Sequence, residues 1–253
     1  MEKQGNRLIV ASHQPHFFPW LGYLDKMAKA DLFLINDLAK GEKKSPMTRN
    51  KILGRDGAEV YISVSIISQN IMAIQNREIQ LSQWAESMER VKGQLIAAYK
   101  KTTPFFDEIW EGLRPVFEAP SQTLLDVDLK TIHALRALYG IETPMRLQST
   151  LDFASQDTPS RNIVVKCKAV HATGYLSGNG GRKYMDLDDF TRENIEVQYQ
   201  QFTYPVYDQH QNRPFVPNLC SLDLLFHCGI EEGRRIFWKN VRSTHEFNGK
   251  ERL

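Results

Sequence analysis

A strand–loop–helix–strand pattern over residues 8–49 constrains the fold of this chain more than any other stretch. Residues 8–11 and 32–35 are short apolar runs, each with the length of a buried strand. Between them, apolar side chains recur at helical spacing after Pro19, a residue that suits the first turn of a helix. Two strands and a helix within about thirty residues form a βαβ unit. The pattern therefore predicts parallel strands and an α/β fold.

The second half of the chain extends this unit to a Rossmann-like three-layer fold with a mostly parallel sheet. Helical patterns alternate there with short β-type segments, which predict strands at residues 141–147, 175–176 and 196–200. Alternating residues also predict a strand at 59–67 and favour another short one within 71–81.

The middle of the chain has a helical pattern. Three successive amphipathic segments fill residues 84–140, and Gly140 ends the last of them as a natural C-cap. These residues show no recognisable chemistry, so we expect a helical layer or insertion against the sheet. A chain of 253 residues fits a single α/β domain, here placed at residues 1–240, followed by a charged C-terminal tail at 241–253.

Composition and charge argue against several classes of function. The 32 Lys and Arg residues nearly balance the 30 Asp and Glu residues, whereas a nucleic-acid-binding protein usually needs a basic excess. The three cysteines show no CxxC spacing, which favours a reduced compartment over a disulfide framework or a structural zinc site. No signal-peptide pattern is visible, and no apolar run approaches the ~20 residues that span a bilayer. We therefore expect a cytoplasmic protein with no membrane partner.

Polar side chains follow both strands of the βαβ unit. His13, Gln14 and His16 come after the first strand, and Asn36 and Asp37 come after the second. Ligands of open parallel sheets bind beyond the carboxyl ends of the strands, so we expect all five side chains in one crevice. The N-terminus of the intervening helix would favour an anion there. The alternative is that His13 is a core histidine bonded to a carbonyl group.

A basic loop is expected after this unit, over residues 40–51. It holds four lysines and one arginine among turn-forming residues. A solvated charged loop would explain this composition, and so would a loop that closes over a phosphate or carboxylate. Arg49 is the strongest candidate ligand, because a guanidinium group can bind an oxyanion through two hydrogen bonds.

A glycine-rich turn follows the strand expected at residues 175–176. Ser177, Gly178 and Gly180 offer backbone N–H groups that can bind an anion, and Arg182 adds a positive charge. A tight turn with no ligand is the alternative. The position of the turn directly after a strand favours phosphate binding.

Several motifs together resemble the bacterial WbqC-like protein family. The motifs are HQP at 13–15, PWLGY at 19–23, RNKI at 49–52, YLSG at 175–178, PNL at 217–219 and DLLF at 223–226. Their order and spacing agree with the family over residues 8–240. The resemblance implies substrate-binding roles for further residues within these motifs, namely Trp20, Asn50, Asn218 and Asp223.

The resemblance also implies a function. Members of the family occur among genes for surface polysaccharides and other specialised metabolites, and have been suggested to attach glycine or a similar acyl group to amino sugars. A weaker likeness in layout links the chain to the HIGH-motif nucleotidyltransferases, although HQPHFFPW stands here in place of HxGH. We therefore expect acyl transfer or amide formation on an amino sugar or related amine. The expected cofactor is ATP or another nucleotide with Mg²⁺, and the expected substrate is a small molecule such as a nucleotide-linked amino sugar.

In such an enzyme His13 and His16 would stabilise the charge on a phosphate or oxyanion, and Asp37 would bind a metal or accept a proton from the amine. Two other functions stay open, namely nucleotidyl or glycosyl transfer at the same crevice, and non-catalytic binding of a nucleotide or sugar. Cys220, near a helix start, is a minor candidate nucleophile. The sequence shows no metal-ligand spacing and does not indicate an oligomeric state.

Overall fold

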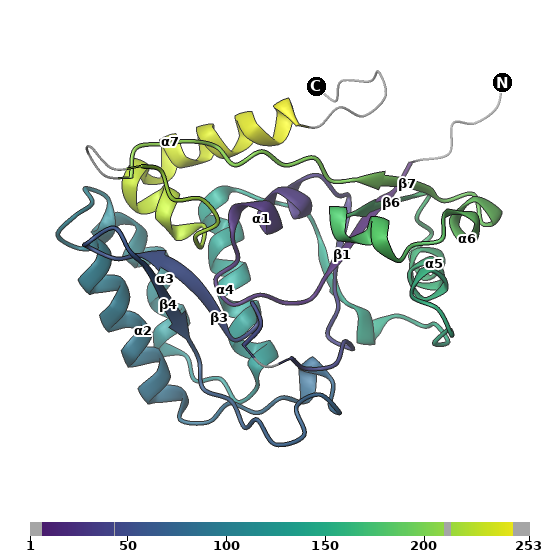
Figure 1. Cartoon of the computed structure of the whole chain (residues 1–253), viewed down its shortest axis with the longest axis horizontal. Coiled ribbons are helices and arrows are strands. Elements are labelled where there is room, and N and C mark those ends of the chain that lie inside the picture. Colours follow the sequence, from purple (N-terminus) through teal and green to yellow (C-terminus); the bar gives the residue numbers. More distant parts are fainter. Residues whose placement is uncertain (1–6, 43, 210–213, 245–253) are drawn as a thin grey trace.

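Strand β1 (Ile9–His13) lies at the centre of a five-stranded sheet in the computed structural model, which describes residues 7–42, 44–209 and 214–244 (Figure 1). The strand order is β5-β2-β1-β6-β7, and every neighbouring pair is parallel. The other strands are β2 (Leu32–Ile35), β5 (Met145–Leu147), β6 (Gly174–Ser177) and β7 (Glu196–Tyr199). The parallel βαβ unit and the Rossmann-like α/β fold expected from the sequence are confirmed.

Alternate residues of the central strands enter two separate apolar cores. Ile9 and Ala11 of β1 join the larger core, whereas Val10 joins the smaller one on the opposite face. Helices α1 (Leu21–Ala28), α4 (Leu124–Tyr139) and α7 (Leu222–Ser243) contribute to the larger core. Helices α5 (Pro159–Ala169) and α6 (Leu187–Arg192) cover the other face. The sheet therefore lies between two helical layers.

A second unit packs beside the larger core. Strands β3 (Arg49–Leu53) and β4 (Glu59–Ser63) form an antiparallel hairpin against helix α2 (Trp84–Tyr99). Helix α3 (Phe106–Glu118) joins α2 to α4 and packs on α4 and α7. The three helices expected within residues 84–140 are present, and Gly140 ends α4 with a φ of 66°. In Figure 1, this unit lies on the side of the molecule away from β6 and β7.

The structure corrects three local predictions around the hairpin. The expected loop at residues 40–51 ends in strand β3, because Ile52 and Leu53 are buried and the strand pairs with β4. The strand expected at 59–67 stops at Ser63 and pairs with β3, outside the parallel sheet. Residues 71–81 contain the 3₁₀ helix η1 (Asn76–Glu78) and isolated bridges in place of a strand.

The C-terminal helix α7 extends past residue 240, where the sequence predicted the end of the domain. Gly229 interrupts the helix with a φ of 77°, and the helix then continues to Ser243. Residues 245–253, which hold most of the charged tail, lie outside the described residues. None of the described helices is long and apolar enough to cross a membrane.

A buried ion pair joins α1 to two distant segments. The Lys29 ammonium group lies 2.9 Å from the Asp25 carboxylate, and both side chains are almost fully buried. Lys29 also donates to the Gln201 carbonyl oxygen at 2.7 Å and to the Thr244 hydroxyl at 2.6 Å. Gln200 donates to Asp25 at 2.7 Å. The pair thus connects α1 with the segment after β7 and with the end of α7.

We expect Lys29→Met to lower the free energy of unfolding by about 3–5 kcal/mol, because the substitution leaves the Asp25 carboxylate buried without its counter-charge. Urea denaturation at pH 7 measures this change. The double variant Asp25→Leu/Lys29→Met should recover most of the loss, since it removes both charges. A double variant as unstable as the single one would contradict the role given to the unpaired charge.

Candidate functional site

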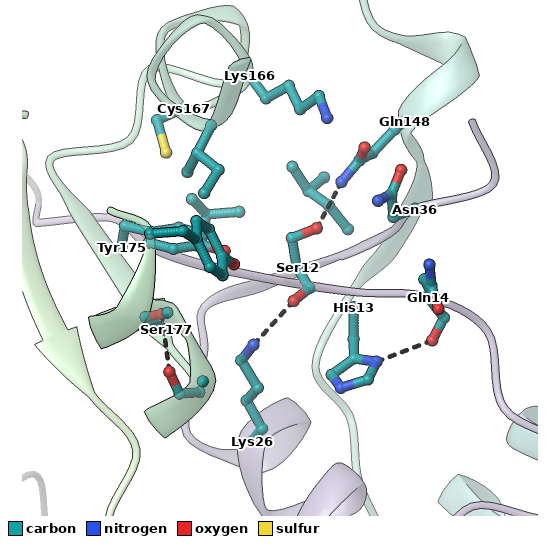
Figure 2. Close-up of a pocket in the computed structure, with 17 residues that line it drawn as sticks. Ser12, His13, Gln14, Lys26, Asn36, Gln148, Lys166, Cys167, Tyr175 and Ser177 are labelled. Carbon is teal, nitrogen blue, oxygen red and sulfur yellow. Dashed lines mark hydrogen bonds between the residues drawn. The ribbon is translucent and has the colours of Figure 1, made fainter. Parts of the chain in front are cut away.

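A cavity of about 400 Å³ lies beyond the carboxyl ends of β1 and β6 (Figure 2). The chain leaves β1 toward β2 on one side of the sheet, and β6 returns to the other side of β1, so the strand order reverses at this point. Ligands of open α/β sheets bind at such switch points. We call it the switch-point cavity, and its polar lining includes Ser12, His13, Gln14, Lys26, Asn36, Gln148, Lys166, Tyr175 and Ser177.

Lys26 brings a buried amine to this cavity. Only 4% of the residue is exposed, and its ammonium group donates to the Ser12 carbonyl oxygen at 2.8 Å. Its Nζ lies 4.0 Å from the position that a Cβ atom at Gly178 would take, so the amine reaches the glycine-rich turn after β6. Burial lowers the pKa of Lys26 from its usual 10.5 to about 8. The amine is therefore protonated at neutral pH but close to its titration range.

Lys166 approaches the same cavity from α5, as Figure 2 shows. Burial lowers the pKa of its amine, while the neighbouring Cys167 and Asp37 oppose that shift. Within the described part of the chain, no residue that lines the switch-point cavity carries a carboxylate. Two lysines without an acidic partner in the lining create a positive potential, which favours an anionic ligand.

His13 is the histidine that faces the switch-point cavity. Its Nδ1 lies 3.1 Å from the Gln14 carbonyl oxygen, so in the tautomer protonated at Nδ1 this nitrogen donates and Nε2 is left as an acceptor. Burial, together with the nearby His16 and Lys26, lowers the pKa of His13 well below its usual value. The ring is therefore neutral at neutral pH and can accept a proton.

Five other candidate residues line a different cavity. His16, Trp20, Arg49, Asn50 and Asn218 surround a space of about 360 Å³ between α1 and the β3–β4 hairpin, which we call the arginine cavity. The two cavities meet at the histidine pair, because the rings of His13 and His16 lie 4.6 Å apart in an edge-to-face arrangement. The side chains expected in a single crevice therefore lie in two separate cavities.

The α1 N-terminus also differs from the expectation. Trp20, the N-cap of α1, lines the arginine cavity, whereas the switch-point cavity is reached by Lys26 near the other end of the helix. Asn36 lines the switch-point cavity as expected, together with Ser177, Gly178 and Gly180 from the turn after β6. The positive charge at the switch-point cavity therefore comes from the Lys26 amine, and not from the N-terminus of α1 as expected.

Three candidate residues lie outside both cavities. Asp37 is buried, and its carboxylate accepts from the Ser149 backbone N–H at 3.0 Å, which fixes the 3₁₀ helix η2 (Gln148–Thr150). Arg182, in the 3₁₀ helix η3 (Asn179–Lys183), stacks 3.7 Å above the Tyr199 ring. Asp223 is buried and accepts hydrogen bonds from Tyr99, Tyr207 and Gln209. Its carboxylate joins α2, α7 and the segment before α7.

The minor candidate Cys220 is also buried. Burial raises the pKa of its thiol to about 12, so the nucleophilic thiolate is not favoured.

Four residues of the switch-point cavity were not predicted from the sequence, namely Ser12, Lys26, Gln148 and Lys166. Helical spacing places Lys26 and Lys166 off the apolar faces of their helices, which is normally the solvent side. Gln148 follows β5, and its amide donates to the Ser12 hydroxyl. The strand predicted at residues 141–147 ends where β5 ends, so the rule that residues after parallel strands meet at one edge would have identified Gln148, had it been applied to this strand.

A larger depression continues the switch-point cavity. It has a volume of about 760 Å³ and shares Asn36, Gln148 and Lys166 with the smaller space. Its remaining polar lining includes Arg77 and Asn162. Together the two spaces form one groove across the ends of β6, β1, β2 and β5, long enough for an extended small molecule.

We expect Lys26→Met to raise the free energy of unfolding at pH 7 by about 2 kcal/mol, because burying the charged amine costs about 1.4 kcal/mol per unit of lowered pKa and only the Ser12 hydrogen bond offsets this. The unfolded amine keeps its proton up to the usual pKa, so the stability of the wild type should rise as pH increases from about 8 toward 10.5. The advantage of the variant should therefore shrink over that range, as urea denaturation can measure.

The matched control is Lys168→Met on the same side of the sheet, where an exposed amine pairs with Glu193. Its effect should stay within about 0.5 kcal/mol, because exposed ion pairs contribute little. A Lys26→Met variant that is less stable than the wild type at pH 7 would show that the amine is a structural contact and not a charge held for a ligand.

Comparison with known proteins identifies the family of this chain. The chain is 28% identical over 226 residues to the uncharacterized protein Rv1507c of Mycobacterium tuberculosis (strain ATCC 25618 / H37Rv), which covers 88% of this chain and 94% of the relative. No solved structure matches the chain. A sequence profile of the WbqC-like protein family matches residues 14–235. This span includes every residue that lines the two cavities except Val10, Ser12 and His13 of β1. The chain therefore belongs to the WbqC-like protein family.

Proposed function

We propose that this protein is a cytoplasmic biosynthetic enzyme that binds an anionic small molecule in the switch-point cavity and transfers an acyl group from it to an amine. The observation that carries the proposal is the pair of lysines in a cavity whose described lining has no carboxylate. Keeping the Lys26 amine charged in a buried position lowers stability, and an anionic ligand would compensate for that cost. The amino-sugar acceptor and the nucleotide dependence come from the family resemblance.

The groove suits a nucleotide or nucleotide-linked substrate. Phosphate oxygens can interact with the ammonium groups of Lys26 and Lys166, and Ser177 to Gly181 bring small residues and backbone close to the same space. Ser12, Gln14, Asn36 and Gln148 are among the neutral side chains available there for hydrogen bonds. Since this lining offers magnesium no carboxylate, a magnesium ion would enter with the phosphates, as is common for this metal.

In this reaction the neutral His13 ring would act as the base. The nitrogen of the acceptor amine would attack the acyl carbonyl carbon, forming the C–N bond, while the bond from that carbon to the leaving oxyanion breaks. The proton released by the amine would pass to His13 Nε2, which the Gln14 hydrogen bond leaves as an acceptor. Lys26 and Lys166 would stabilise the departing oxyanion. This assigns His13 a proton-accepting role in place of the charge-stabilising role expected from the sequence, because its pKa is lowered.

A ligand screen tests the anion site. ATP, CTP, UDP-sugars and dTDP-sugars, each with and without Mg²⁺, should include a compound that raises the melting temperature by mass action. Lys166→Met should weaken its binding about tenfold or more through the lost charge–phosphate contact, whereas the control Lys168→Met should bind like the wild type. The affinity should also fall as pH rises through about 8, because Lys26 then loses its proton. No shift with any nucleotide would contradict the nucleotide-dependent reaction.

A His13→Ala variant separates an enzyme from a binding protein. If His13 accepts the proton, the variant should still bind the compound found in the screen with little change in Kd, while turnover falls about 10²–10⁴-fold. Calorimetry and a rate assay with the same compound and an amino sugar measure the two effects. A large loss of affinity with no loss of rate at saturation would instead support a binding role for the ring.

A further inference from the structure

The arginine cavity lies on the opposite side of the histidine pair from the switch-point cavity. His16 lines the arginine cavity, His13 lines the switch-point cavity, and their rings are in contact at 4.6 Å. The arginine cavity also lies between elements that are far apart in sequence, because Trp20 precedes α1, Arg49 begins β3 and Tyr61 belongs to β4. The two cavities are therefore separated by the two imidazole rings, and each ring lines one of them.

The charges of this lining are unbalanced. Lys44, Arg49 and Lys51 all face the cavity, and no residue in its described lining is acidic. Lys51 is partly neutralised by Glu59, whose carboxylate lies 2.6 Å from its amine. The Arg49 guanidinium group stacks 4.3 Å from the centre of the Tyr61 ring, and among the described residues it has no carboxylate within ion-pair distance. Stacking fixes the plane of the guanidinium and leaves its N–H donors for another partner.

His16 provides a second, independent observation. Only 6% of the residue is exposed, and its buried Nδ1 has no hydrogen-bond partner among the described residues. Burial lowers the pKa of its ring to about 4, so the ring is neutral. A buried ring nitrogen without a hydrogen-bond partner is costly to the fold, and the ring that carries it lines the arginine cavity.

The wall of the cavity is held by backbone contacts. Asn50 donates to the Phe18 carbonyl oxygen at 2.6 Å, and the Cys220 N–H donates to the Lys51 carbonyl oxygen at 2.8 Å. The Phe17 N–H donates to the Pro46 carbonyl oxygen at 2.9 Å. The loop after β1, the start of β3 and the segment before α7 are thereby connected, so the positions of Arg49 and His16 are set before any ligand binds.

We infer that the arginine cavity binds the oxyanion group, a carboxylate or a phosphate, of a second substrate, while the first occupies the switch-point cavity. The second substrate reaches the reacting centre at the His13–His16 pair. Its anionic end is held by Arg49 with help from Lys44. The assignment to a second substrate depends on the proposed acyl transfer, but the presence of an oxyanion site does not.

Calorimetric titration of the full chain with inorganic phosphate and with succinate, against chloride at matched ionic strength, tests the site. Arg49→Gln should weaken binding of at least one of the two probes about tenfold or more, since it removes the forked charged donor. The matched control is Arg55→Gln, an exposed arginine in the turn of the same hairpin, which should bind like the wild type. Phosphate preference would indicate a phosphorylated second substrate, and succinate preference would indicate a carboxylate.

Two further measurements keep the inference distinguishable from the proposed function. Lys26→Met should still bind the probe at the arginine cavity. A Lys26→Met variant that loses nucleotide binding but keeps probe binding would therefore show that the two sites are separate.

In nuclear magnetic resonance spectra of protein labelled at histidine, the His16 ring signal, assigned with His16→Gln, should move on probe addition in the wild type and not in Arg49→Gln. If Arg49→Gln folds poorly, Arg49→Lys should retain the fold and bind at least several-fold more weakly. Equal probe binding in the wild type and the Arg49 variants, or binding no tighter than chloride, would overturn the inference.

Discussion

Parallel pairing of β1 on both of its edges is the constraint from which the rest of the structure follows. Val10 of β1 pairs with Leu32 on one side and with Tyr175 on the other, so β2 and β6 are fixed in register by the same strand. That register brings the residue after β1 and the turn after β6 to one edge of the sheet. The switch-point cavity is therefore a result of topology, and the side chains around it determine only what it can bind.

Charge inside the molecule is arranged in two different ways. Lys29 of α1 is buried with a carboxylate and two oxygen acceptors, so its charge is compensated within the fold. Lys26, one turn earlier on the same helix, has a single carbonyl acceptor and opens onto a cavity. Neighbouring positions on one helix thus serve separate purposes, since the compensated amine fixes the fold and the uncompensated amine stays available.

The sequence predicted the parallel sheet and the middle helices because both produce strong local patterns. It did not predict that α1 is buried on nearly every side, because spacing assumes one apolar face and cannot show that residues 200–201 and α7 cover the other. It placed His13 and His16 in one crevice, whereas the loop between β1 and α1 carries His16 to a different space. Phe18 in that loop has a φ of 43°, and Asn50 from the distant β3 holds it there. Such long-range contacts leave no periodic signal.

The central position of β1 also has a consequence for biosynthesis. During translation this strand is made before both of its neighbours in the sheet, and the residues that cover one of its edges, Gly174–Ser177, emerge more than a hundred residues later. An uncovered strand edge is a site of intermolecular pairing, and contacts between distant parts of a chain form slowly. Until β6 emerges, the nascent chain holds an apolar strand with one open edge, and a chaperone at the ribosome would protect it from aggregation.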